Sequence, residues 1–160
     1  MVNYSSDEAV LDSWTIPSLL LGGISTNSLK NMAQRYFTNK LRGQMVDFYN
    51  NNLRGTSETH PILGEINFTN IGIKKTKNTS ADTRKLKAIP ELPRLIRTGL
   101  YEGSKNPNKE KAKFNLYDYL INETQIDGKP FKHRITIGND ANGKHFYNIN
   151  DIDYSPPFQE

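Results

Sequence analysis

The sequence predicts a small α+β domain, and two observations carry that prediction. Residues 64–150 read as one strand, a basic helical stretch and then three strands. Two turn signals, "IDGKP" and "NDANGK", join the last three strands. Asp-Gly or Asn-Gly between alternating segments strongly indicates a hairpin, so this last third is expected to be antiparallel. A chain of 160 residues is long enough to bury the core of one such domain.

The first predicted element is a long helix that begins near Ser25 or Thr26 and ends at Leu53. Its apolar residues recur at helical spacing: Leu29, Met32, Ala33, Tyr36, Phe37, Leu41, Met45, Phe48, Tyr49 and Leu53. We expect residues 1–55 to form an N-terminal arm and this amphipathic helix. Residues 56–160 are expected to form a basic α+β domain with an acidic, Pro-containing tail. The helix is expected to pack on the protein's own core, with a groove for a partner as the alternative.

The next predicted elements are one strand and two short helices. "GEINFTNIGIKK" alternates in a strand-like way, and "RKLKAIPELPRLIRTGLYEG" reads as two helical pieces. Pro90 and Pro93 suit the first turn of the second piece, because that turn needs no backbone N–H donor there. The buried stripe of this piece is expected to contain Leu92, Leu95, Ile96 and Leu100. The strands "FNLYDYLINETQI", "FKHRITI" and "HFYNI" follow.

Positive charge is concentrated in the predicted domain. Residues 71–145 contain 16 Lys or Arg against 8 Asp or Glu, in a chain of net charge +4. Such a surplus favours a nucleic-acid partner. The candidate phosphate-binding residues are Lys74 and Lys75 after the first strand, Arg84 at the helix, and Lys132 and Arg134 on one face of a hairpin. Tyr117, Tyr119 and Tyr147 lie near them and could stack on bases. A solvated lysine-rich surface is the alternative for each basic residue.

Three histidines are the candidates for acid–base chemistry. Imidazole titrates near neutrality, so His133 and His145 could transfer protons in RNA cleavage without a metal. Each has an alternative. His133 shares strand parity with Phe131, Ile135 and Ile137 and could be a hydrogen-bonded inward residue, whereas His145 could be an exposed residue at a hairpin end. His60, before Pro61, is the weakest candidate.

Several classes of protein are not expected. The chain has no cysteine, no pair of histidines at metal-ligand spacing and no phosphate-binding glycine loop. We therefore expect no metal and no cofactor. The longest apolar stretch, "IPSLLLGGI", is far too short for a membrane span, and the N-terminus does not resemble a signal peptide. A soluble protein without a membrane partner is expected.

Three segments together resemble a known family. "GEINFTNIGIKK", "RKLKAIPELPRLI" and "IDGKPFKHRITIGNDANGKHFYNI" are similar to large polyvalent protein-associated domain 3, a phage-linked family assigned to the barnase-like (BECR) nuclease fold. The resemblance covers roughly residues 60–150. It implies helices packed on a four-stranded antiparallel sheet whose open face holds RNA, and metal-independent cleavage. It also implies roles for the polar residues on the matching pieces, which are Thr69, Lys74, Arg84, His133 and Tyr147.

These observations predict an RNase-like toxin or effector domain that acts on RNA. His133 or His145 would transfer protons, Thr69 and Tyr147 would form hydrogen bonds, and the products would carry 2′,3′-cyclic phosphate ends. The expected location is the cytoplasm of a bacterial host, reached by phage or by secretion as part of a larger protein. An immunity protein or a host protein would be a further partner. The alternative is a non-catalytic phage or mobile-element protein that uses the same fold to bind and inhibit a host protein or a nucleic acid.

Overall fold

The structure, a computed structural model, describes residues 26–79, 83–107 and 113–152. The chain divides into two compact units, Met1–Gln44 and Met45–Glu160. Helix α2 spans Thr26–Phe48 and continues as the π-helical turn η2, Tyr49–Leu53, so the predicted long helix is confirmed. The predicted arm at residues 1–25 and the end of the predicted tail at residues 153–160 lie outside the described residues.

The described strands form one mixed sheet. They are β1 (Ser57–His60), β2 (Gly64–Asn67), β3 (Leu100–Lys105), β4 (Leu116–Ile126), β5 (Lys129–Asp140) and β6 (Gly143–Asp151). Their order is β1-β2-β6-β5-β4-β3. Strands β2 and β6 run parallel, whereas the other neighbouring strands are antiparallel. The α+β class is therefore confirmed, but the prediction of a four-stranded antiparallel sheet is wrong.

The two extra strands and the parallel pair have little signal in the sequence. Strand β1 is the polar tetrapeptide "SETH", and β3 contains Gly103 at φ 124°. Such short polar or glycine-containing segments lack the alternation that marks a strand. The parallel contact joins Ile66 to Lys144 and Asn67 to His145, residues far apart along the chain. Local patterns cannot report a pairing of this range.

Both predicted hairpins are confirmed. Asp127 and Gly128 have φ values of 53° and 78°, the left-handed pair that a two-residue turn between β4 and β5 requires. The second loop joins Asp140 to Gly143, which pair with each other and leave two residues between them. Gly143 has φ 123°, a conformation that favours glycine.

The segment after β2 is a helix and not the end of a strand, which corrects the prediction for "GEINFTNIGIKK". Helix α3 spans Asn70–Thr79. Gly72, Ile73 and Thr76 are buried. Thr76 lies about one turn after Gly72 and Ile73, so the three residues share one face of the helix. A Cβ atom at Gly72 would lie 2.4 Å from the Phe146 ring, so the missing side chain lets the helix approach β6 closely. Close packing on β6 overrides the local alternation of Ile71 and Ile73.

The two predicted helical pieces are present. Helix α4 (Thr83–Lys87) leads through the 3-10 turn η3 (Ile89–Glu91) into α5 (Leu92–Arg97), with prolines in the first turns of η3 and α5. Leu92, Leu95 and Ile96 are fully buried. Leu100 was expected in the same stripe, but it is 73% exposed because the chain has already entered β3.

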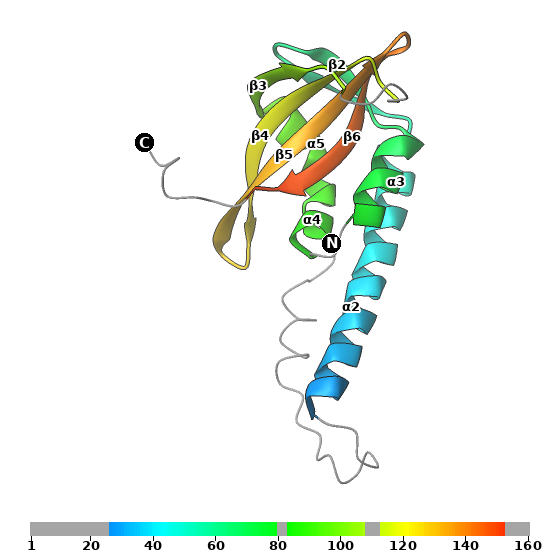
Figure 1. Ribbon diagram of the computed structural model, residues 1–160, viewed down its shortest axis with the longest axis vertical. Helices are drawn as coiled ribbons and strands as arrows, with labels where there is room; N and C mark the ends of the chain where they lie inside the picture. The colour runs from blue at the N-terminus through cyan, green and yellow to red at the C-terminus, as the bar shows by residue number, and fades with distance from the viewer. Residues whose placement is uncertain (1–25, 80–82, 108–112, 153–160) are drawn as a thin grey trace. The chain divides into compact units, whose positions relative to one another are not determined.

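The sheet has one face covered by helices and one face that the described helices leave open. Figure 1 shows α4 and α5 on one side of β4–β6. Leu120, Ile135 and Ile149 point to that side and form the core with α5 and η3. Tyr49, Phe68 and Phe146 form a second apolar group, with ring centroids 6.0–6.2 Å apart. Side chains that alternate with the core residues lie on the opposite, open face.

Candidate nucleic-acid interface

The open face carries a cluster of aromatic rings that we call the tyrosine face, made of Phe114, Tyr117, Tyr119 and Tyr147. The ring centroids of Tyr117 and Tyr147 are 5.5 Å apart, and Phe114 lies 5.9 Å and 5.3 Å from them. Gly138 makes room, since a Cβ atom there would lie 2.3 Å from the Phe114 ring. Tyr147 occupies the extra position of a bulge in β6, which the register shift between Thr136 and Ile137 reveals.

Two cations border the tyrosine face. The Lys75 ammonium of α3 lies 5.8 Å from the centroid of the Tyr147 ring, and the Arg134 guanidinium lies 5.7 Å from that of Tyr119. Arg134 also donates from Nη2 to Glu102 at 2.8 Å, whereas its Nε is buried and has no hydrogen-bond partner among the described residues. Rings with adjacent cations are suited to stacked bases and phosphate charge.

The tyrosine hydroxyl groups influence one another. Burial raises the pKa of Tyr117, and the neighbouring Tyr147 and Tyr119 raise it further. Tyr117 therefore stays neutral at physiological pH. A neutral phenol can donate a hydrogen bond to an oxygen acceptor such as a phosphate or a base carbonyl.

Of the three histidines, His145 lies on the tyrosine face, opposite Gly138 and 5.9 Å from the Phe114 ring. It is 8% exposed. Its Nε2 is 2.9 Å from Asp140 Oδ1, and this hydrogen bond holds the pKa of Asp140 below its usual value. The other ring nitrogen, Nδ1, is buried and has no hydrogen-bond partner within the described residues. The hydrogen bond to Asp140 favours the tautomer that carries the proton on Nε2, and this tautomer has a lone pair on Nδ1.

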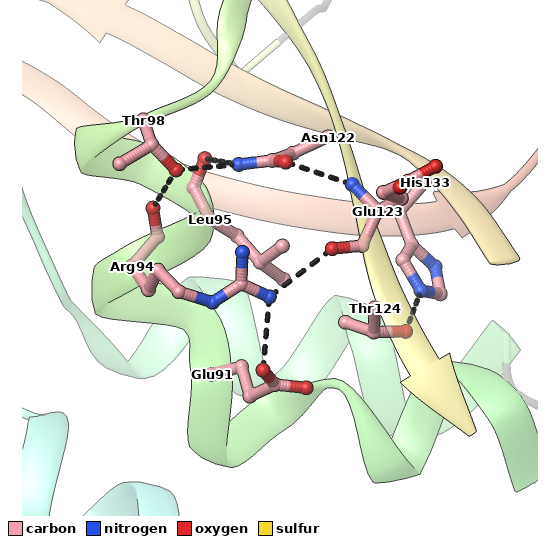
Figure 2. A network of polar contacts seen from close by, with 8 residues as sticks. All are labelled: Glu91, Arg94, Leu95, Thr98, Asn122, Glu123, Thr124 and His133. Atoms are coloured by element: carbon pink, nitrogen blue, oxygen red, sulfur yellow. Dashed lines mark hydrogen bonds and ion pairs between the residues drawn. The ribbon is translucent and has the colours of Figure 1, made fainter. Parts of the chain in front are cut away.

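His133 lies on the opposite, helix-covered face. Its side chain is 0% exposed, and both ring nitrogens are engaged, Nε2 with Thr124 Oγ1 at 2.7 Å and Nδ1 with Asp151 Oδ1 at 3.0 Å. Figure 2 shows the contact with Thr124 beside polar contacts that tie β4 to η3 and α5, such as those of Arg94. The structure therefore does not bring His133 together with Tyr147, and its contacts are those of a structural histidine.

His60 is also held by the fold. It is buried, and its Nδ1 accepts the backbone N–H groups of Ile62 and Leu63 at 3.1 and 3.2 Å. Its Nε2 must therefore donate to the Gly99 carbonyl, 2.7 Å away. This neutral tautomer fixes the β1–β2 turn against the end of α5.

The remaining predicted residues are divided between the two faces. Lys132 pairs with Glu123 in register and has the same strand parity as Arg134, so it lies on the open face. Arg84 lies on the other face, with Nε 3.6 Å from Asp151 and its guanidinium 5.0 Å from the Phe131 ring centroid. Lys74 is exposed on α3.

Thr69 lies apart from both sets, after β2. Its carbonyl accepts the Tyr49 hydroxyl at 2.6 Å. Its own Oγ1 is buried and has no hydrogen-bond partner among the described residues. Of the predicted residues, the structure thus brings together Tyr147, His145, Lys75, Lys132 and Arg134 on or beside one face.

Two polar groups were not singled out from the sequence. Lys85 is 4% exposed, and its Nζ donates to Asn150 Oδ1 at 3.1 Å. Asp118 is buried beside Lys144, Asn139 and Tyr101; burial acts to raise its pKa, but the hydrogen bonds from Lys144 and Asn139 hold it below its usual value. In the sequence Lys85 stands between Arg84 and Lys87, and this basic pattern does not indicate that its side chain is buried.

Neither a metal centre nor a membrane span was found in the part of the chain that the structure describes. It contains no group of three or more His, Cys, Asp or Glu residues arranged to hold a metal ion. None of its helices is long and apolar enough to cross a membrane.

One of three comparisons with known proteins gives a match. The family model of large polyvalent protein-associated domain 3 matches residues 24–147, which extends the resemblance beyond residues 60–150 to include α2. No curated protein and no solved structure matches. The family points to a phage-associated polyvalent protein. The chain belongs to the large polyvalent protein-associated domain 3 family.

Proposed function

We propose that this protein binds single-stranded RNA on the tyrosine face. The observation that supports the proposal is the pair of partly exposed rings Tyr117 and Tyr147, whose centroids lie 5.5 Å apart on a sheet face that the described helices leave open. Both rings pack on Phe114, which is buried beneath them. Rings on a sheet face are a common platform for unstacked bases, and each stacked base contributes about 1–3 kcal/mol. Double-stranded RNA hides its bases and is the poorer ligand for such a face.

The charges beside the rings support the same ligand. Lys75 and Arg134 lie against two of the tyrosines, and Lys132 lies on the same face. Basic side chains next to stacking rings can neutralise the phosphates of the strand whose bases the rings hold. Binding should therefore weaken strongly as salt increases.

The test is the fluorescence anisotropy of a labelled single-stranded RNA of about 10 nucleotides, measured in EDTA. We expect Tyr117→Leu and Tyr147→Leu each to weaken binding about tenfold, the loss of roughly one stacking interaction. Tyr36→Leu is the matched control, because Tyr36 is 64% exposed and belongs to helix α2, which precedes the first strand in the sequence. Binding of duplex RNA with equal affinity, or equal loss in the control, would contradict the proposal.

A second candidate function is metal-independent RNA cleavage, and the His145–Asp140 pair favours it. This chemistry requires that RNA binding uncovers His145 Nδ1, which is buried in the RNA-free chain. The Nδ1 atom would then accept the proton of a ribose 2′-hydroxyl, and the 2′-oxygen would bond to phosphorus as the bond to the 5′-oxygen breaks. The leaving 5′-oxygen would take a proton from solvent, and a 2′,3′-cyclic phosphate end would remain. Lys75 and Arg134, which border this face, could stabilise the negative charge that develops on the phosphate.

Cleavage is tested on the same RNA in EDTA by analysis of its ends. The candidate predicts cyclic phosphate ends, loss of at least about a hundredfold in rate for His145→Gln, and a smaller loss for Asp140→Asn. His60→Gln controls for a buried histidine with a structural contact. RNA that stays intact at high protein excess would rule out cleavage and leave the binding proposal standing.

A further inference from the structure

An ion pair crosses β4 on the open face of the sheet. Arg134 of β5 donates from Nη2 to Glu102 Oε1 of β3 at 2.8 Å, although β4 lies between these two strands. Residues that pair directly put their side chains on the same face, so the strand register identifies the neighbours of the ion pair. Leu100, Ile121 and Arg134 form one row across the three strands, and Gly103, Tyr119 and Thr136 form the next. The ion pair therefore lies beside Ile121 and the Tyr119 ring.

The surface around this ion pair is apolar and accessible. Leu100 is 73% exposed, and Ile121 and Tyr119 are half-buried. Gly103 has no side chain beside the Tyr119 ring, and an added Cβ atom there would meet nothing within 4 Å. Nucleic-acid bases bind to such surfaces by stacking on aromatic or guanidinium groups while polar side chains hydrogen-bond to their edges.

The atoms of the ion pair differ in what they can still bind. Of the Arg134 nitrogens, Nη2 donates to Glu102 and Nε is buried without a partner among the described residues, so Nη1 is the remaining donor group. Glu102 accepts this one hydrogen bond on Oε1, and a carboxylate has about four acceptor sites on its two oxygens. The ion pair thus presents one donor group next to two acceptor oxygens.

Guanine has the complementary pattern on its Watson–Crick edge. That edge carries the acceptor O6 and then two adjacent donors, N1–H and the N2 amino group. Adenine offers one donor and one acceptor on this edge, whereas uracil and cytosine each offer one donor and two acceptors. A carboxylate can accept both guanine donors at once, so guanine is the base that uses both oxygens of Glu102 and the free donor of Arg134.

We propose that Glu102 and Arg134 recognise one guanine base of the bound RNA. The Glu102 carboxylate accepts N1–H and N2–H, Arg134 Nη1 donates to O6, and the base lies against Leu100 and the Tyr119 ring. This site rests on the proposed function, because the base belongs to a strand stacked on the tyrosine face. Tyr117 and Tyr119 are two residues apart on β4, about 7 Å along the strand, so a base next to the one on Tyr117 reaches the ion pair.

The first test compares oligouridines of about 10 nucleotides that carry either one central guanosine or one central adenosine. Both purines stack, so a difference in affinity reports the contacts of the base edge. The unmodified protein is expected to prefer guanosine about tenfold. Glu102→Gln is expected to reduce this preference below about threefold without weakening the adenosine strand, since the variant loses a negative charge. Glu123→Gln is the control, because it removes the same charge from an exposed position on the same face of β4 and should keep the preference.

Base analogues identify the atoms that the protein contacts. Inosine lacks the N2 amino group, so a strand with inosine is expected to bind with an affinity between those of the guanosine and adenosine strands. A strand with 7-deazaguanosine lacks only N7, which the proposed contacts do not use, and should bind as the guanosine strand does. Loss of the preference with 7-deazaguanosine would contradict recognition of the Watson–Crick edge.

The second test separates failure of the guanine site from failure of RNA binding. Guanosine monophosphate at millimolar concentration is expected to shift the backbone amides of Glu102, Gly103 and Arg134 saturably, and adenosine monophosphate or the Glu102→Gln variant should give much smaller shifts. If RNA fails to bind while this pattern holds, the guanine site stands and the RNA proposal falls. If RNA binds with equal affinity whichever purine it carries, or if both nucleotides give equal shifts, the guanine site is overturned.

Discussion

His133 and Lys85 are both buried polar side chains, and their contacts give them different roles. Hydrogen bonds with Thr124 and Asp151 engage both nitrogens of His133, so removing the ring leaves the buried Thr124 hydroxyl without this partner. Lys85 has an ammonium that burial disfavours. The first residue therefore stabilises the fold, whereas the second reduces stability.

His133→Ala is expected to lower the free energy of unfolding by about 2–3 kcal/mol, because it leaves a cavity and removes the hydrogen-bond partner of the buried Thr124 hydroxyl. Urea denaturation measures the loss. RNA affinity measured well below the melting temperature should change less than about twofold, because His133 lies on the face opposite Tyr147. A large loss of affinity in the folded variant would show that His133 acts in the site.

Lys85→Met is expected to stabilise the protein at pH 7, and the gain should shrink as pH rises from about 8 to about 10.5. The pKa of Lys85 is about 8 in the folded chain, below the ordinary lysine value of 10.5 that applies in the unfolded chain. Between these values the unfolded state binds more protons, so the stability of the unmodified protein rises with pH and approaches that of the variant. The charged groups near Lys85 are Lys75 on α3, Arg84 on α4 and Asp151 on β6.

Thermal unfolding of both proteins at pH 7 and pH 9.5 checks this prediction. Lys74→Met, at an exposed position, controls for net charge. A stability difference that is the same at both pH values would mean that Lys85 is an ordinary solvated lysine.

At the scale of elements, the fit between α3 and β6 positions the tyrosine face. Gly72 allows the contact, since an added Cβ would lie 2.4 Å from the Phe146 ring and 2.6 Å from the Phe146 carbonyl oxygen. The ring could move, but the carbonyl belongs to the backbone of β6. A side chain here must therefore displace the helix that carries Lys75 and Thr76.

Gly72→Ala is expected to destabilise the protein by about 1–3 kcal/mol through overpacking and to weaken RNA binding, because Lys75 moves with α3. Gly43→Ala is the matched control in helix α2. An added Cβ there meets nothing within 4 Å, so the greater helix propensity of alanine should stabilise by up to about 1 kcal/mol. Urea denaturation of both variants gives the comparison. Equal effects of the two substitutions would contradict the close contact.

The elements differ in how well the sequence predicts them. Pro90 and Pro93 were both expected in the first turn of one helical piece, whereas Pro90 lies in η3 and Pro93 in α5. Glycines marked both hairpins. Helix α3 was missed because Ile71 and Ile73 alternate as in a strand, and packing of Gly72 on Phe146 decides the outcome. The parallel β2–β6 contact depends on long-range geometry that no local pattern contains.

The candidate site was predicted in part for the same reason. Strand parity correctly placed Lys132, Arg134 and Thr136 on one face. Parity alone did not separate a catalytic His133 from a structural one. The contact of Lys85 with Asn150 joins residues 65 positions apart, so it could be found only from the folded chain.

At the scale of the whole molecule, the described helices leave one face of the sheet open, and we propose that the ligand binds there. Helices α4 and α5 cover one side of β4–β6, and α3 covers the free edge of β6. The aromatic rings and their neighbouring cations lie on the remaining side. An immunity protein or a host protein as a further partner stays a prediction.

The most direct test is a map of backbone amide chemical shifts as single-stranded RNA is added to the full chain. The account predicts saturable shifts at Tyr117, Tyr119, Thr136 and Tyr147, together with Lys75 beside the Tyr147 ring. The amides of α5 (Leu92–Arg97) and β1 (Ser57–His60) should not move. Saturable shifts centred on α5 and β1, or no saturable shift at all, would contradict the assignment of the tyrosine face as the RNA-binding surface.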